Sequence, residues 1–135
     1  MTIIYIDTSA LLKRVVVEKE SPEVRRVLRE TNAAGDVVAA SELAWLEVWR
    51  TLRRMSVDDL ESAATTALCG IAEIPLTTDI LVRARRIGPA MLRSLDAVHL
   101  TSAVAIGATT VLTYDDRMAR AAADLGFEAF GAAHS

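Results

Sequence analysis

Short apolar runs alternate with helical patterns along the whole chain, and this alternation constrains the fold more than any other feature. Five runs have the composition and length of strands: residues 2–6, 36–40, 73–76, 109–114 and 127–130. Pro75 interrupts the third run, and because proline cannot donate a ladder hydrogen bond, we expect that strand at an edge of the sheet. The segments between the runs carry apolar residues at helical spacing, beginning with Leu11, Leu12, Val15 and Val16.

Polar residues mark where the predicted helices begin. Ser21 reads as an N-cap followed by Pro22 in the first turn, and Ser41 and Asp115 are further N-cap candidates. Other helices are expected to begin at residues 57–59 and 77–79, and a largely apolar one runs from Ser94 to a stop at Gly107. Strands that alternate with helices across short loops predict a doubly wound α/β fold, a parallel sheet with helices on both faces.

Length and composition agree with one soluble domain. The chain has 135 residues, 52% of them hydrophobic, so we expect a single domain over residues 1–135. Cys69 is the only cysteine, which excludes an intrachain disulfide, and its apolar neighbours predict a buried thiol. No signal-peptide pattern and no uncharged run of about 20 residues is present, so we expect no membrane span and a cytoplasmic location.

The net charge of −3 argues against nucleic-acid binding through bulk positive charge. Thirteen of the fifteen basic residues are nevertheless arginines. Arginine binds phosphate and carboxylate groups bidentately, so this bias is compatible with local phosphate contacts or with a charged partner, as well as with ordinary solvated helix faces.

Two acids follow predicted strands directly. Asp7 comes after the run 2–6, and Asp115 follows the run 109–114. In a parallel sheet both positions lie at the edge where ligands bind. Each acid has a simpler interpretation as a helix N-cap, and Asp116 reads as a first-turn acid that the helix dipole favours.

Two more acids lie among apolar residues. Asp96 is in the first turn of the apolar helix, on the face that carries His99 and Ala103, and Glu47 lies mid-helix between Trp45 and Trp49. A carboxylate near apolar surface is costly unless it is paired or bound to metal. The alternatives are a favourable helix dipole for Asp96, and for Glu47 an ion pair with the arginine three residues on.

Gathered carboxylates repel one another unless a cation offsets their charge, and oxygen ligands alone suit Mg²⁺ or Mn²⁺. His134 is in the tail and His99 is expected in the core, at a partner contact or beside the ligands, so zinc is not expected.

Three motifs together give the chain a family resemblance: residues 6–11 (IDTSAL), residues 94–100 (SLDAVHL), and residues 112–115 (LTYD) followed by RMARAA. In this order they resemble a PIN domain, and more narrowly a VapC-type toxin of a bacterial toxin–antitoxin pair. The resemblance implies an acidic quartet of Asp7, Glu47, Asp96 and Asp115, with Thr8 or Ser9 as an auxiliary hydroxyl ligand and Asp116 as an extra acid. Glu42 competes with Glu47, because many relatives carry Thr three residues before the helix acid and this chain has Ala44 there.

The resemblance also implies an activity and partners. It implies a homodimeric endoribonuclease that uses Mg²⁺ or Mn²⁺ to activate water for attack on the RNA phosphodiester, inhibited by a VapB-type antitoxin whose arginine competes for the carboxylates. Trp45 and Trp49 are candidates for the antitoxin groove or for core packing. The alternative function is a catalytically silent PIN-fold module that only binds protein. A haloacid-dehalogenase-like site does not fit, because the position two residues after Asp7 is Ser9, and a receiver site does not fit, because no Lys follows Lys19.

Overall fold

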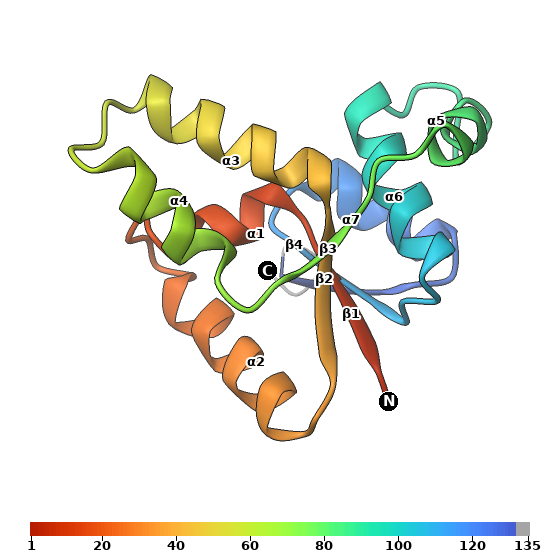
Figure 1. Cartoon of the computed structure of the whole chain (residues 1–135). Coiled ribbons are helices and arrows are strands. Elements are labelled where there is room, and N and C mark those ends of the chain that lie inside the picture. Colours follow the sequence, from red (N-terminus) through yellow and green to blue (C-terminus); the bar gives the residue numbers. More distant parts are fainter. Residues whose placement is uncertain (132–135) are drawn as a thin grey trace.

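The computed structural model of the protein describes residues 1–131 and contains one sheet of five parallel strands (Figure 1). The strands are β1 (Ile3–Ile6), β2 (Val37–Ser41), β3 (Ala72–Ile74), β4 (Thr110–Thr113) and β5 (Glu128–Gly131). Their order in the sheet is β3-β2-β1-β4-β5, and every neighbouring pair is parallel. The doubly wound fold class expected from the sequence is confirmed.

Within the described residues, seven helices cover the two faces of the sheet (Figure 1). They are α1 (Thr8–Leu12), α2 (Ser21–Ala33), α3 (Glu42–Arg54), α4 (Leu60–Leu68), α5 (Thr78–Ala84), α6 (Ser94–Ala105) and α7 (Asp116–Asp124). Side chains alternate across each strand, so Ile6 and Leu112 pack with α1 to α4 while Tyr5 and Val111 pack with α5 to α7. The sheet therefore separates two apolar cores.

The predicted strands all form, and β3 lies at an edge of the sheet as Pro75 indicated. Ser41 and Asp115 cap α3 and α7 as predicted. The helix expected through Val16 ends early, because the chain turns after Leu12.

Two local predictions are wrong. Ser21 is the first residue of α2 and not its N-cap, because its hydroxyl donates to the carbonyl of Val16 and accepts from the N–H of Glu18. Cys69 is exposed and not buried, because it follows the last turn of α4 at the surface. His134 lies outside the described residues.

The strand order reverses direction between β1 and β4, since β2 and β3 follow on one side of β1 while β4 and β5 lie on the other. Connections diverge at such a point and leave a crevice beyond the carboxyl ends of the two strands, where doubly wound proteins bind their ligands. Asp7 and Asp115 follow these two strands. No helix within residues 1–131 has the length and apolar content needed to cross a bilayer.

Candidate active site

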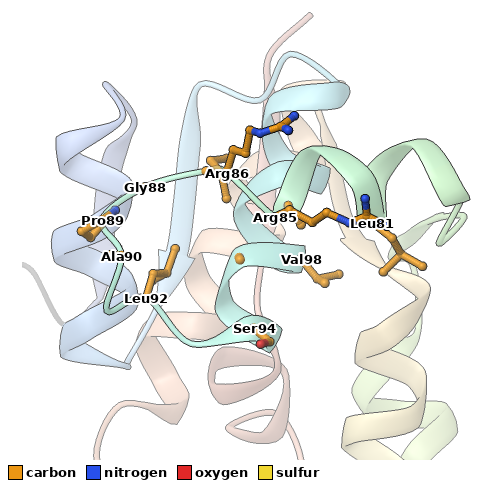
Figure 2. Close-up of a pocket in the computed structure, with 12 residues that line it drawn as sticks. Leu81, Arg85, Arg86, Gly88, Pro89, Ala90, Leu92, Ser94 and Val98 are labelled. Carbon is orange, nitrogen blue, oxygen red and sulfur yellow. The ribbon is translucent and has the colours of Figure 1, made fainter.

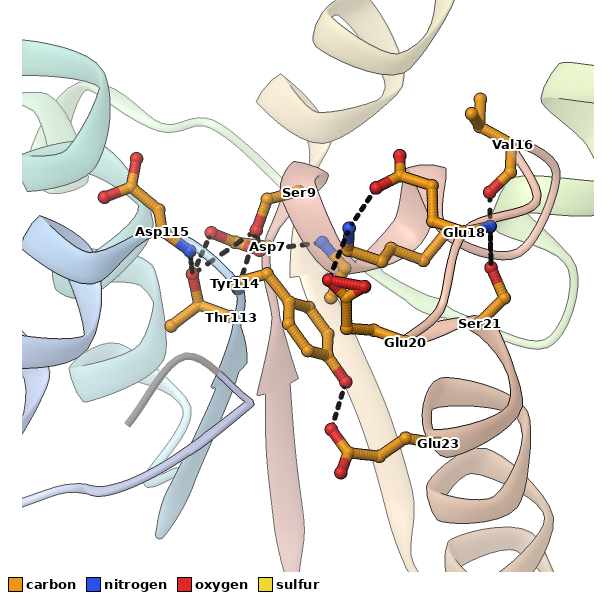
Figure 3. Close-up of polar contacts among 12 residues, drawn as sticks. Asp7, Ser9, Val16, Glu18, Glu20, Ser21, Glu23, Thr113, Tyr114 and Asp115 are labelled. Carbon is orange, nitrogen blue, oxygen red and sulfur yellow. Dashed lines mark hydrogen bonds and ion pairs between the residues drawn. The ribbon is translucent and has the colours of Figure 1, made fainter. Parts of the chain in front are cut away.

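Asp7 is held rigidly at the end of β1 (Figure 3). Its Oδ1 accepts hydrogen bonds from the Ser9 hydroxyl at 2.7 Å and from the Ala10 N–H at 3.1 Å. Its Oδ2 accepts from the Thr113 hydroxyl at 2.6 Å, across the β1–β4 junction. Only 4% of Asp7 is exposed, and this burial raises the pKa of Asp7, which the three hydrogen bonds only partly counteract.

Asp115 follows β4 and begins α7. Its backbone N–H donates to the Thr113 hydroxyl at 3.0 Å, and its Oδ1 accepts from the N–H groups of Arg117 and Met118 at 2.9 and 3.0 Å. Asp115 is exposed, and in Figure 3 its carboxylate points away from Asp7. The N-cap interpretation is therefore correct for Asp115, as it is for Asp7, which caps α1. A cap uses one carboxylate oxygen, so it does not exclude a second role for the other.

Asp96 lies in the first turn of α6 and is half-buried. Within residues 1–131 its carboxylate has neither a hydrogen-bond nor an ion-pair partner. Burial raises the pKa of Asp96, and the like charges of Asp115 and Asp7 raise it further. Asp96 thus lies within electrostatic reach of both Asp7 and Asp115, which belong to two other elements at the crevice.

Glu47, on α3, belongs to a buried polar chain. Its Oε1 accepts from the Thr8 hydroxyl at 2.8 Å and lies 2.6 Å from His99 Nε2. His99 Nδ1 lies 2.5 Å from the Tyr5 hydroxyl, which accepts from the Ser41 N–H at 3.0 Å. The two ring nitrogens of His99 therefore join Tyr5 to Glu47.

The partner of Glu47 is therefore His99, and the expected pair with Arg50 is absent from the ion pairs within residues 1–131. Burial raises the pKa of Glu47, but the hydrogen bond and charge of His99, together with the Thr8 hydrogen bond, bring it below its usual value. Because Thr8 follows Asp7 directly, this contact ties Glu47 to the side of the crevice where Asp7 lies.

The sequence of this chain is similar to those of several known proteins. Residues 4–124 match the family model described as PIN domain. The chain belongs to the PIN domain family. It is similar to Ribonuclease VapC47 of Mycobacterium tuberculosis, with 38% identity over 126 residues, 92% of this chain and 93% of that protein. Within the family it therefore groups with the VapC ribonucleases.

Two solved structures share the fold. One is the crystal structure of VapC20 from Mycobacterium tuberculosis, described as a toxin that cleaves the sarcin–ricin loop: TM-score 0.68, 20% identity, covering 92% of this chain and 95% of that one. The other is VapBC2 from Rickettsia felis bound to a DNA fragment from their promoter: TM-score 0.72, 14% identity, covering 96% and 98%. At these identities the two structures establish the shared fold and not a shared substrate.

The donor chemistry of this PIN domain suits a hard divalent cation. Carboxylate oxygens are the ligands that Mg²⁺ and Mn²⁺ prefer, and Asp96 has two oxygens without a partner in the described part of the chain. As the side chains stand, no three His, Cys, Asp or Glu residues among residues 1–131 are gathered closely enough to enclose an ion. Mutual repulsion of like charges favours such a spread arrangement. The residue types fit the cation, and closing a site around it requires the side chains to move.

The remaining acids of the prediction lie elsewhere. Glu42, the competitor of Glu47, is exposed, and its Oε1 accepts from the Leu76 N–H at 2.6 Å, so it fastens the segment after β3. Asp116 is an exposed acid in the first turn of α7. The structure thus gives Glu47, and not Glu42, the contacts that lead to Asp7.

Sequence patterns missed two members of this network. Tyr5 alternates with isoleucines and looks like a core residue, yet its hydroxyl orients His99. Thr113 looks like an ordinary strand residue, yet its buried hydroxyl joins Asp7 to the backbone of Asp115. The sequence indicated these contacts only through spacing, because Thr113 precedes Asp115 by two residues and His99 follows Asp96 by three.

A second surface feature of the PIN domain is an apolar hollow of about 580 Å³ between α3 and α4. Its lining residues are Trp45, Leu46, Trp49, Ala64, Thr65, Leu68 and Cys69. Trp45 is partly buried against the core, whereas Leu46 and Trp49 are 59% and 41% exposed. Of the two tryptophans, Trp45 therefore packs on the core while Trp49 is open to a partner.

Proposed function

We propose that this PIN domain is a Mg²⁺- or Mn²⁺-dependent endoribonuclease and acts in the cytoplasm as the toxin of a type II toxin–antitoxin pair, the single domain extending over residues 1–135. The observation that supports the proposal is that Asp7 and Asp115 follow the two strands of the switch point, with Asp96 within electrostatic reach of both. Buried or half-buried carboxylates without enough counter-charge are unfavourable for stability, which favours a cationic ligand as the reason for their presence.

The four acids of the proposed site have different tasks. Asp7 provides the fixed ligand, because three hydrogen bonds hold its carboxylate. Asp96 and Asp115, at helix starts, supply the remaining carboxylates, and Glu47, held by Thr8 and His99, assists. One or two divalent ions held by these residues would lower the pKa of coordinated water and offset negative charge on the phosphodiester. Because water attacks and not the 2′-hydroxyl, the products carry 5′-phosphate and 3′-hydroxyl ends.

Cleavage by purified protein tests the proposal. We expect the wild-type chain to cut structured RNA with Mg²⁺, and Asp96→Asn to cut it at least about 100-fold more slowly because one ligand charge is lost. Asp58→Asn removes the charge of an exposed acid outside the site and should leave cleavage unchanged. Undiminished cleavage by Asp96→Asn would remove Asp96 from the mechanism.

Sequencing of RNA 5′ ends after induction identifies the substrate. New 5′-phosphate ends should appear with wild type and be absent with Asp7→Asn. The same ends with both proteins would show that Asp7 is not needed for cutting in the cell.

We further propose that a VapB-type antitoxin docks in the hollow between α3 and α4. The exposed indole of Trp49 and the exposed Leu46 give that hollow an apolar surface suited to an amphipathic partner helix. An arginine from the partner reaching the quartet would form charge-assisted hydrogen bonds with the same carboxylates, so antitoxin and metal would compete.

Binding to the product of the gene immediately upstream tests this surface. Trp49→Ala should weaken the complex at least about tenfold, because a large buried anchor is lost. Met55→Ala serves as a control, since Met55 is similarly exposed at the C-cap of the same helix and lies outside the hollow. Equal affinities of both variants would exclude the hollow as the main docking site.

The family resemblance also leads us to propose a homodimer. Sedimentation equilibrium should give twice the mass of one chain, and a monomer across the accessible concentration range would exclude the dimer.

A further inference from the structure

Three arginines surround Asp96 in a hollow of about 190 Å³ between the start of α6 and α7. The hollow is lined by Pro89, Met91, Leu92, Arg93, Asp96, Arg117, Arg120, Ala121 and Asp124. Arg93 precedes α6, whereas Arg117 and Arg120 lie on the first two turns of α7. All three arginines are exposed.

In the described part of the chain none of these arginines forms an ion pair with a carboxylate, although the charge of Arg93 acts on Asp96. Two other surface arginines have a carboxylate partner, Arg26 with Glu30 and Arg83 with Asp79. Arg120 contacts only a backbone oxygen, that of Asp116, at 3.4 Å. Asp96 and Asp124 also line the hollow and offset part of the charge, but three guanidinium groups against two carboxylates leave a local excess of positive charge beside the site.

An apolar surface borders the same hollow. Met91 is 91% exposed, the most exposed large hydrophobic side chain in the described residues, and it lines the hollow together with Pro89. A methionine so open to water at the rim of a charged groove offers a flexible apolar contact to the face of a base that is not paired in a duplex.

We propose that this groove binds a single-stranded stretch of RNA next to the bond that is cut, with Arg93, Arg117 and Arg120 on successive phosphates and Met91 against an unpaired base. Charge complementarity carries the choice of occupant: unpaired guanidinium groups bind phosphate oxygens bidentately, and Asp96 places the groove beside the candidate catalytic centre. Because RNA is the substrate only under the proposed function, the inference rests on that function. It explains how a chain of net charge −3 holds a polyanion, through a local strip of arginines.

A neighbouring hollow supplies a direct comparison (Figure 2). It has about 600 Å³ and carries Arg85, Arg86 and Ser94, while Pro89 and Leu92 line both hollows and form the wall between them. If RNA ran through this second hollow instead, the loss of Arg85 and Arg86 would matter more than the loss of the three arginines beside Asp96.

Fluorescence anisotropy with a labelled single-stranded RNA, in EDTA so that nothing is cut, tests the groove. The variant R93Q/R117Q/R120Q should bind roughly 10- to 100-fold more weakly, with a slope of log affinity against log salt smaller by about 2, since each phosphate contact contributes about 0.7. The matched control R25Q/R29Q/R53Q removes the same charge from exposed positions on α2 and α3 and should bind nearly as wild type. Duplex RNA of the same sequence should bind less tightly than the single strand.

Two results would overturn the inference: a loss for the triple variant no larger than for its matched control, or a larger loss for R85Q/R86Q than for the triple variant. Cleavage with Mg²⁺ is measured separately on the wild type. RNA binding that depends on the three arginines, without any cleavage, would support the groove and contradict the proposed nuclease. Cleavage at the same rate with and without the three arginines would support the nuclease and contradict the groove.

Discussion

Thr113→Val isolates the hydroxyl that joins the two central strands at the site. Thr113 is fully buried, and its hydroxyl donates to Asp7 Oδ2 at 2.6 Å while accepting from the Asp115 N–H at 3.0 Å. Valine has nearly the same volume, so the substitution removes these bonds without leaving a cavity. A hydrogen bond to a charged group contributes about 1.5 to 3 kcal/mol, and the exposed end of α7 lets water replace the second bond. We therefore expect a loss of about 2 to 3 kcal/mol in the free energy of unfolding.

Thermal unfolding in EDTA measures this loss against a matched control. For a chain of this size 1 kcal/mol corresponds to roughly 3 to 4 °C, so Thr113→Val should melt about 6 to 12 °C below wild type. Thr113→Ser keeps the hydroxyl and loses one buried methyl, which costs about 1 kcal/mol. Packing alone would make valine the milder change, so a Thr113→Val protein as stable as Thr113→Ser would refute the reasoning.

The loss should also depend on pH. The Thr113 hydrogen bond lowers the pKa of Asp7 against the larger effect of burial, so its removal raises that pKa further. Asp7 in the folded variant therefore stays protonated to a higher pH than Asp7 in the folded wild type, whereas the unfolded states of the two proteins bind protons alike. The stability difference is therefore smallest at low pH, where Asp7 is protonated in both proteins, and grows as pH rises between the two folded pKa values.

Three further changes have defined outcomes. Asp96→Asn in EDTA should stabilise the fold near neutral pH by a few tenths to about 1 kcal/mol after solvent screening. The raised pKa makes ionised Asp96 unfavourable, so the gain vanishes below about pH 4, and urea unfolding at several pH values measures it. His99→Phe leaves half-buried Glu47 without its main partner and should lower the free energy of unfolding by about 2 to 4 kcal/mol in the same assay, whereas an unchanged stability would contradict the pairing. Gly131→Ala should destabilise by more than about 2 kcal/mol, because Gly131 has φ of +97° and an added Cβ would lie 2.3 Å from the Thr113 carbonyl oxygen, and an unchanged melting temperature would contradict that clash.

Local sequence was enough to predict the sheet. The run before Asp7 is β-branched and short, and such runs form strands wherever they can be buried on both faces. Pro75 predicted the edge position of β3 because proline cannot donate a ladder hydrogen bond, and this property does not depend on tertiary contacts. By contrast, the early end of α1 and the place of Ser21 depend on contacts between segments, such as Arg14 with the carbonyls of Ala67 and Cys69, which periodicity does not reveal.

The site was predictable only as far as topology reaches. Parallel strands end at one edge, so Asp7 and Asp115 were expected there, and the structure finds both at the switch point. The contacts between Tyr5 and His99 and between Asp7 and Thr113 join residues 94 and 106 positions apart, so they depend on strand register and helix rotation. Asp115 also shows that one residue can be both an N-cap and a candidate ligand, so the cap interpretation of Asp115 does not exclude the ligand interpretation.

Isothermal titration with Mn²⁺ tests the central claim most directly, that the carboxylates at the switch point hold a divalent cation. Wild type and the control Asp58→Asn should bind the ion saturably and alike, and Asp96→Asn should bind it at least about tenfold more weakly, since a charged ligand is lost. Asp58 is exposed and lies outside the site, so its variant controls for the charge change. No saturable binding by wild type, or equal binding by all three proteins, would contradict the account and favour a PIN fold that only binds protein.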